Sequence, residues 1–254
     1  MIYEDEPFVD RIDRVADHGF DTVEFWSWHN KDLNAIKTRL DEQGVSLAAM
    51  GSRSEAEANP EEMTRALTNP ETRAEAVEDI ERSIETASRL NCSNLIVSVG
   101  PNGPYTRGEM YESIIKGLRE VAPAAESADV TLVIEPLNTL VDHEGYFLSE
   151  SSTGCDIVRD VNSPAVKLLF DIYHQQITEG NIINNITSNL NQIAHIHAAD
   201  VPGRHEPGTG ELNYRNVFTV LDDAGFNGSV GFEFSPADNA EQALTSIAAL
   251  SESR

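Results

Sequence analysis

Lysine is scarce in this sequence, which contains only Lys31, Lys37, Lys116 and Lys167 among 254 residues. Lysine and arginine together number 18 against 43 acidic residues, so the formal net charge is -25. Such a charge repels the phosphates of DNA and RNA and argues against a nucleic-acid partner. Acidic excess with few lysines resembles the surfaces of salt-adapted (halophilic) cytoplasmic proteins, in which high ionic strength screens the self-repulsion.

Cysteines and long apolar runs are also rare. Cys92 and Cys155 have no partner at a spacing typical of metal sites, and we interpret both as buried thiols in a reducing compartment. Residues 1–10 lack the basic start and apolar core of a signal peptide. No apolar stretch is long enough for a membrane-spanning helix. We therefore expect a soluble, cytoplasmic protein with no membrane partner.

Short β-branched runs alternate with helical periodicity along the whole chain. The predicted strands are residues 22–26, 46–51, 94–99, 130–136, 166–171, 193–199 and 229–234. This alternation predicts parallel βα units, and the length suits one α/β barrel domain over residues 1–254. A closed barrel has eight strands, and residues 1–3 are too few to supply the eighth. We expect a TIM-type (β/α)8 barrel that lacks most of its first strand, with the natural start upstream of this one.

Four late strands each carry a candidate metal ligand near the C-terminal end, namely Glu135, Asp171, His197 and Glu233. The C-terminal ends of barrel strands lie around one common mouth, so we expect these side chains to converge. Each of them alone is more often a capping or ion-pairing residue, but four at equivalent positions indicate a metal site. Three carboxylates and one imidazole favour Mn²⁺, Mg²⁺ or Co²⁺ over a sulfur-preferring metal.

Two further residues are candidates for substrate binding. His174 follows Asp171 by one helical turn, where it can face the same cavity or anchor a loop. Arg204 lies in a Gly/Pro-rich loop, where it can bind a substrate carboxylate through two hydrogen bonds or pair with a surface acid. His195 alternates with His197, and we predict that it points into the helix layer with a structural role.

Other features carry less information about function. Trp26, Trp28 and Tyr105 follow early strands and could either wall the pocket or pack in the core. The glycines of residues 208–210 are too few and too late for a dinucleotide-binding fingerprint. No serine or cysteine lies in a recognisable nucleophile elbow. Hydride transfer and covalent hydrolysis are therefore not indicated.

The segments VIEPLN, DIYHQQ, HIHAADVPGRHEPGTGELNY and GFEFSP resemble the hydroxypyruvate isomerases, within the larger group of xylose isomerase-like barrels that includes ketose 3-epimerases. The likeness runs from Gly19 to the end, and EPGTGELNY is its most specific part. It implies a metal at the ends of the fifth to eighth strands, with Glu135 and Glu233 as acid and base. Asp171 and His197 would be the remaining ligands. Hydroxypyruvate isomerases often have glutamine where this chain has His197, whereas the sugar enzymes have histidine.

The expected chemistry follows from such a site. A divalent ion stabilises an enediolate, one glutamate removes the proton α to the carbonyl, and the other returns it to the neighbouring carbon. We predict an aldose–ketose-type isomerase that converts hydroxypyruvate to tartronate semialdehyde, with Arg204 or His174 orienting the substrate. The resemblance also makes a homo-oligomer plausible.

Three other functions remain open. A ketose or related sugar 3-epimerase on the same scaffold is supported by His197. A DNA-repair phosphodiesterase is opposed by the net charge of -25. A degenerate barrel that binds a metabolite or a partner protein without catalysis is opposed by the presence of all four ligand types.

Overall fold

The computed structural model of the chain describes residues 2–52 and 65–252. Each of the seven predicted strands is present, although several end earlier than predicted. They are β1 (Thr22–Phe25), β2 (Ser46–Gly51), β3 (Asn94–Val97), β4 (Thr131–Ile134), β5 (Val166–Asp171), β6 (Ile193–His197) and β7 (Ser229–Gly231). The α-helices are α1 (Phe8–Asp17), α2 (Leu33–Gln43), α4 (Arg73–Arg89), α5 (Arg107–Ala128), α6 (Ser151–Val161), α7 (Ile172–Thr178), α8 (Ile182–Asn189), α9 (Tyr214–Asp223) and α10 (Ala240–Glu252), and a 3-10 turn, η2, spans Leu190–Gln192.

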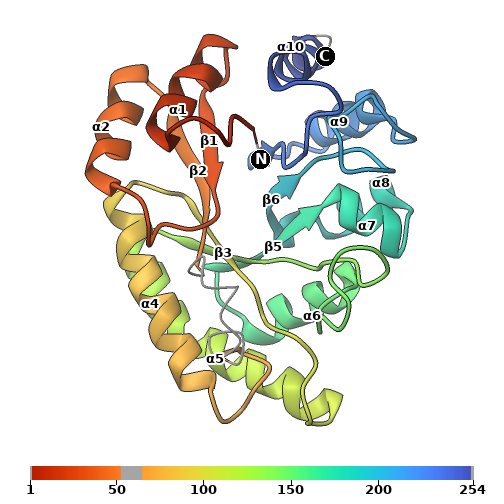
Figure 1. The fold of residues 1–254 in the computed structure, drawn as a ribbon. Coiled ribbons are helices and arrows are strands. Elements are labelled where there is room, and N and C mark those ends of the chain that lie inside the picture. Colours follow the sequence, from red (N-terminus) through yellow and green to blue (C-terminus); the bar gives the residue numbers. More distant parts are fainter. Residues whose placement is uncertain (1, 53–64, 253–254) are drawn as a thin grey trace.

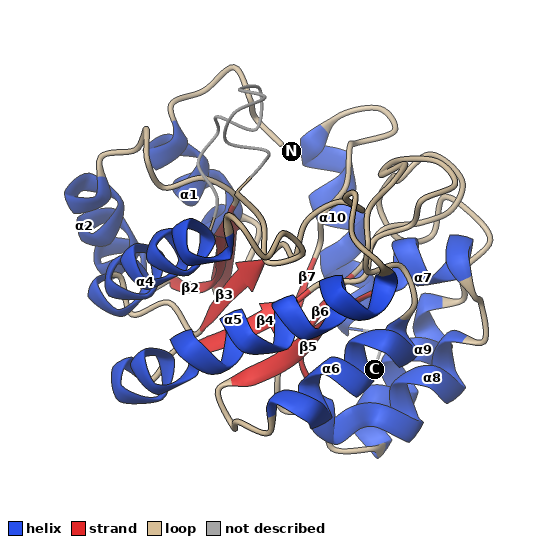
Figure 2. Ribbon diagram, turned by 90° about the horizontal axis from the view of Figure 1, so that it is seen from below, coloured by secondary structure: helices blue, strands red, loops and turns tan. Residues whose placement is uncertain are grey.

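All strands belong to one parallel sheet in the order β1-β2-β3-β4-β5-β6-β7. The sheet curls into a nearly closed TIM barrel with the helices on its outside (Figure 1 and Figure 2). Helices alternate with the strands because a parallel connection must cross over one face of the sheet. The fold class predicted from the alternation is confirmed.

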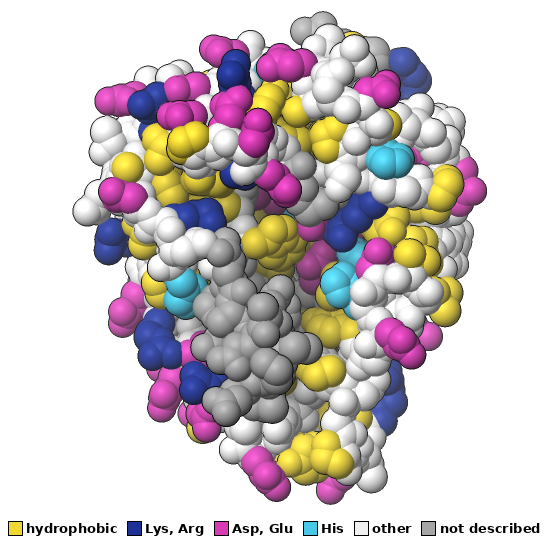
Figure 3. Space-filling model, in the orientation of Figure 1, with side chains coloured by type: hydrophobic (Ala, Val, Ile, Leu, Met, Phe, Trp, Pro, Cys, Tyr) yellow, Lys and Arg dark blue, Asp and Glu magenta, His cyan; other side chains and the backbone are white. Residues whose placement is uncertain are grey.

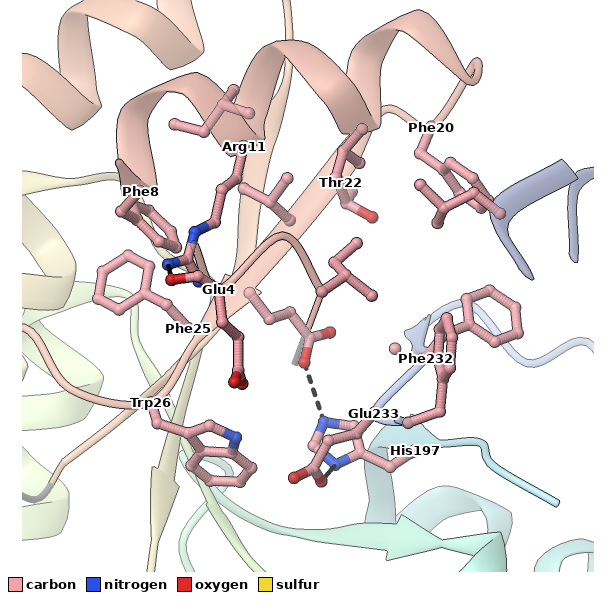
Figure 4. A pocket seen from close by; sticks show the side chains of 18 of the residues that line it. Glu4, Phe8, Arg11, Phe20, Thr22, Phe25, Trp26, His197, Phe232 and Glu233 are labelled. Atoms are coloured by element: carbon pink, nitrogen blue, oxygen red, sulfur yellow. Dashed lines mark hydrogen bonds and ion pairs between the residues drawn. The ribbon is translucent and has the colours of Figure 1, made fainter. Parts of the chain in front are cut away.

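The barrel has a seam between its first and last strands. Within residues 2–52 and 65–252, β1 and β7 pair with β2 and β6 respectively but not with each other. A cavity of about 350 Å³ lies between them, lined largely by apolar side chains of α1, β1 and the β7 region (Figure 4). The seam stands where an eighth strand would complete the ring, as the strand count predicted.

The barrel interior holds an apolar layer beneath the candidate site. Ala49, Ile96, Val133 and Leu169 are buried against one another there. Residues two apart in a strand share a face, so Val133 is followed on the same side by Glu135, and Leu169 by Asp171. The acids therefore lie directly above a layer of buried aliphatic side chains.

The face shown in Figure 3 carries more acidic than basic side chains. In the view of Figure 3, acidic side chains are spread over the molecule among fewer basic ones. Among the described helices, none combines the length and apolar character needed to cross a bilayer.

Candidate active site

The four predicted metal ligands lie together at the C-terminal ends of the strands. Asp171 and His197 are the last residues of β5 and β6, while Glu135 and Glu233 follow β4 and β7. One ligand atom from each lies within 4.8 Å of those of the other three. Figure 4 shows His197 and Glu233 side by side at the inner end of the cavity, with Trp26 across from them.

His197 lies close to both glutamates of the cluster. His197 Nδ1 lies 3.1 Å from Glu233 Oε2 and 3.6 Å from Glu135 Oε1. Glu135 Oε1 and His197 Nδ1 are buried, and neither makes a hydrogen bond of good geometry within the described residues. Buried polar atoms usually have partners, so these two are suited to a ligand that lies between them.

Glu24, which the sequence analysis did not single out, holds His197 from behind. Its Oε2 lies 2.9 Å from His197 Nε2, and its Oε1 lies 2.9 Å from His195 Nε2. A carboxylate only accepts hydrogen bonds, so Nε2 of His197 carries a hydrogen, and Nδ1, which faces the acids, is the nitrogen that would bind a metal ion after losing its own proton. This is the carboxylate–histidine arrangement typical of a metal ligand.

The prediction for His195 is wrong in its direction. His195 is fully buried beside His197, with ring centroids 5.0 Å apart, and both rings contact Glu24. Residues two apart in a strand lie on the same face, and a turn to the opposite face requires a spacing of one. A signal for Glu24 was present, since the run TVEF places a carboxylate in an otherwise apolar strand.

Gly231 makes the room that Glu24 occupies. A Cβ atom at position 231 would lie 2.3 Å from Glu24 Oε1, well inside van der Waals contact. Because Gly231 has no side chain, the carboxylate can lie against the β7 backbone and reach both histidines.

The site concentrates negative charge at a buried position. Burial raises the pKa of Glu135 despite the opposing effect of His197. Burial acts the same way on Glu233, but His197 and Arg204 outweigh it and lower the pKa of that carboxyl. Burial alone would lower the pKa of His197, yet Glu24, Glu135 and Glu233 raise it well above its ordinary value. The donor set and its charge therefore fit a divalent cation held by oxygen and imidazole ligands.

Arg204 adds a cation at the rim of the cluster. Its Nη2 lies 2.8 Å from Glu233 Oε2 and 3.6 Å from Asp171 Oδ2, and the guanidinium lies over the ring of Tyr173. Its φ of +55° is left-handed, which is uncommon for a residue with a side chain. Such conformations persist where the surrounding structure holds them, and here the side chain is directed at the acids.

The loop that carries Arg204 is organised by Asp200. This fully buried carboxylate accepts hydrogen bonds from three backbone N–H groups, those of Val201 at 2.9 Å, Gly208 at 2.8 Å and Leu212 at 3.1 Å. One side chain thus ties the start, middle and end of the loop together.

Asp200→Asn is expected to lower the free energy of unfolding by about 2 kcal/mol, because an amide cannot accept on both sides and its N–H₂ opposes at least one backbone N–H. Urea denaturation followed by circular dichroism measures the change. Asp41→Asn, on the exposed face of α2, is the matched control and should shift the midpoint little. Equal midpoints for the two variants would contradict this role of Asp200.

His174 lies in the first turn of α7, which begins directly after Asp171. The Asp171 carboxylate accepts from the His174 backbone N–H at 3.1 Å and so caps the helix. The imidazole is fully buried, and burial is the largest cause of its lowered pKa. Its Nε2 lies 3.7 Å from Asp171 Oδ2, so the structure brings this predicted substrate-binding residue to the cluster.

The three aromatic candidates divide between the two interpretations. Trp26 is 42% exposed and lies edge-on to His197, with ring centroids 6.1 Å apart, so it forms part of the site wall. Trp28 donates a hydrogen bond to Ser83 at 3.1 Å, and Tyr105 packs against the main core.

The sequence is similar to a known protein family and to isomerases of other organisms. The family described as xylose isomerase-like TIM barrel matches residues 12–252. The chain is 34% identical over 237 residues to the 2-oxo-tetronate isomerase of Cupriavidus necator, covering 93% of this chain and 90% of that protein. It is 29% identical to the hydroxypyruvate isomerase of Escherichia coli strain K12, covering 96% and 94%.

Solved structures give the same fold. A structure described as an AP endonuclease, family 2, from Brucella melitensis superposes with a TM-score of 0.90 at 29% identity, covering 98% of this chain and 95% of that one. A D-psicose 3-epimerase structure superposes with a TM-score of 0.77 at 22% identity, covering 96% and 84%. At that identity the second likeness concerns the fold alone.

Proposed function

Because the chain belongs to the xylose isomerase-like TIM barrel family and is an isomerase like its curated relatives, we propose that it is a metal-dependent isomerase of short hydroxy-keto acids, with hydroxypyruvate as the reference substrate. The observation that carries the proposal is the convergence of Glu135, Asp171, His197 and Glu233 within 4.8 Å, with the Arg204 guanidinium beside them. The acids provide proton transfer, and the guanidinium provides recognition of a carboxylate.

The four side chains would hold the metal ion, with His197 contributing Nδ1. When bound, the ion supplies Lewis acidity toward the carbonyl and hydroxyl oxygens of the substrate. The orphaned atoms Glu135 Oε1 and His197 Nδ1 and the excess of carboxylates support this assignment.

The protein's own residues perform the proton transfer. Glu233, whose pKa is lowered, is the ionised group that removes a proton from C3 of hydroxypyruvate, the carbon that bears the hydroxyl. The C3–H bond breaks and an enediol forms between C2 and C3. Glu135, whose pKa burial raises, delivers a proton to C2. The hydroxyl proton on O3 is lost as O2 gains one, which gives tartronate semialdehyde with no net change in atoms or electrons.

An activity screen tests the proposal. Protein freed of metal with a chelator is reloaded with Mn²⁺, Mg²⁺ or Co²⁺ and assayed with hydroxypyruvate, 2-oxo-tetronate and neutral ketoses of three to six carbons. We expect interconversion of a keto acid that depends on the added ion. Activity that survives chelation in full, or that is confined to neutral ketoses, would overturn the metal or the substrate assignment respectively.

Glu24→Gln is expected to weaken metal affinity by about 10- to 100-fold, the usual effect of losing the carboxylate behind a ligating histidine. A glutamine oxygen can accept from only one of the two imidazoles, while its N–H₂ group opposes the other. Calorimetric titration of the chelated protein with Mn²⁺ measures the affinity. Glu4→Gln is the control, because Glu4 lines the same cavity but is exposed. Equal affinities in the two variants would show that Glu24 does not position His197.

The alternative is a sugar 3-epimerase on the same scaffold, which His197 supports as a ligand shared with that branch. An epimerase returns the proton to the carbon from which it came, so solvent deuterium enters without movement of the carbonyl. In the isomerase, deuterium appears at C2 as the carbonyl moves to C3. Mass spectrometry and NMR of the product in D₂O separate the two.

The name of the Brucella structure suggests a DNA-directed nuclease as a further alternative. Affinity for DNA depends mainly on lysine and arginine contacts to phosphates, and this chain has a net charge of -25. The charge therefore favours the isomerase over this alternative.

A further inference from the structure

Asn138 is a buried amide that the proposed reaction does not use, and it lies directly against His174. Neither side chain has exposed surface. The Asn138 side-chain nitrogen, Nδ2, lies 2.7 Å from His174 Nδ1, and the Asn138 backbone nitrogen lies 3.2 Å from the same atom. One ring nitrogen thus meets two nitrogens from a single residue.

The orientation of the Asn138 amide is fixed by its other contacts. Its Oδ1 accepts hydrogen bonds from the backbone N–H groups of Val141 at 2.9 Å and Asp142 at 3.2 Å. Its Nδ2 donates to Asp142 Oδ2 at 2.7 Å. Turning the amide round would set N–H₂ against two N–H groups and an oxygen against a carboxylate, so the side-chain nitrogen is the atom that faces His174.

This arrangement determines where the hydrogen of His174 lies. Because Nδ1 meets only N–H donors, it must accept, and the single hydrogen of the neutral ring is then on Nε2. A protonated ring would place an N–H against the two donors of Asn138, so the same contacts also disfavour the cation.

The opposite nitrogen faces the candidate active site. His174 Nε2 is buried without a hydrogen bond and lies 3.7 Å from Asp171 Oδ2, and Arg204 Nη2 lies 3.6 Å from that same oxygen. We propose that Asn138 is a positioning residue that holds His174 as the Nε2–H tautomer, so that the ring presents a fixed donor to a carbonyl or carboxylate oxygen of the substrate. The use of this donor by substrate rests on the proposed function, whereas the tautomer does not.

A reciprocal exchange tests the proposal without changing composition or charge. In the double variant Asn138→Asp/Asp142→Asn, the amide at position 142 can donate to the carboxylate at position 138. The Tyr173 hydroxyl, which donates to Asp142 at 2.9 Å in the native protein, can accept a hydrogen bond from the new amide instead. The hydrogen bond between the two positions is kept but reversed. A carboxylate oxygen now replaces the closer donor of His174 Nδ1, and its charge outweighs the backbone N–H that remains at 3.2 Å, so a hydrogen on Nδ1 is favoured.

The direct readout is the ¹⁵N chemical shift of the ring nitrogens in histidine-labelled protein, with the His174 signals identified by their loss in His174→Gln. We expect Nε2 protonated and Nδ1 unprotonated in the native protein, and Nδ1 protonated in the double variant. The single variant Asp142→Asn is the matched control, because it retains Asn138 and should keep the native tautomer. If the double variant does not fold, Asn138→Ala replaces it: this variant keeps only the longer backbone hydrogen bond of 3.2 Å, so the Nδ1-protonated form should become detectable beside the native one.

The second readout is kinetic. With the metal-loaded protein, the double variant should lose about 10²-fold in kcat/KM, the usual effect of removing one preorganised donor. A native ring protonated on Nδ1, or a double variant with an unchanged tautomer, would overturn the role of Asn138. A reversed tautomer with unchanged kcat/KM would overturn the use of the donor by substrate. If the native protein isomerises no substrate, both the proposed function and the use of the His174 donor by substrate are wrong. The ¹⁵N shifts still decide which tautomer His174 adopts.

Discussion

Replacement of Glu233 by glutamine is expected to lower kcat by about 10³-fold, because an amide of the same shape cannot accept a proton from carbon. Loss of the base also prevents exchange of the C3 hydrogen with solvent. Both quantities are measured with hydroxypyruvate in D₂O, at metal concentrations that keep the site occupied and with metal content determined on the same samples. A variant that keeps full activity would remove Glu233 from the proton transfer.

Two companion variants separate proton transfer from metal binding. Glu135→Gln should also abolish isomerisation but retain exchange at C3, since Glu233 can still remove and return that proton. Asp171→Asn removes a ligand that has no proposed proton-transfer role, and asparagine is an equally good cap for α7. Its activity should therefore recover with excess Mn²⁺, whereas that of Glu233→Gln should not. If all three variants recovered activity with excess Mn²⁺ to the same extent, the acids would serve only as metal ligands.

Replacement of Arg204 by methionine is expected to lower kcat/KM for a keto acid by about 10²-fold or more, because truncating one member of a buried charge pair costs roughly 3 kcal/mol. Arg204 pairs with Glu233 of the cluster at 2.8 Å, and its guanidinium can bind a carboxylate through two hydrogen bonds. The informative quantity is the ratio of kcat/KM for hydroxypyruvate to that for dihydroxyacetone, which has no carboxylate. This ratio should fall steeply in the variant.

The controls for Arg204 address charge and volume. Arg204→Lys keeps the charge but not the planar pair of donors and should recover only part of the preference for the acid. Arg89→Met makes the same change on the exposed side of α4, where the guanidinium bonds Asn34 at 3.1 Å, and should leave the ratio unchanged. If both substrates lose equally in Arg204→Met, the residue supports the site without recognising the carboxylate.

The strands were predictable because each is a short run, mostly of apolar residues, that a turn signal or helix follows. Their C-terminal limits were not: Ser98 and Val99, for example, were predicted in the strand, but the pairing of β3 ends at Val97. Glu135 and Glu233 lie just past β4 and β7 for the same reason. A polar residue at the end of an apolar run still marks the C-terminal end of a strand, which is why the four candidate ligands could be selected from the sequence.

The contacts behind the ligands were beyond local patterns. Glu24 and His197 are 173 residues apart, and they meet only because β1 and β6 curl toward each other around the barrel. The contact of Asn138 with His174 depends on the path of the loop after β4. The error over His195 had a different cause, since the period of the strand was applied with the wrong spacing.

The close approach of Gly231 to Glu24 couples the substitutions that these two positions can accept. A side chain at position 231 would occupy the volume of the carboxylate, so it requires Glu24 to move away from the histidines or position 24 to carry a smaller residue. Loss of the carboxylate would in turn leave His195 and His197 without the charged group that lies 2.9 Å from both. Substitutions at 24 and 231 should therefore occur as pairs among related barrels, and an engineered library that varies one of them should vary the other with it.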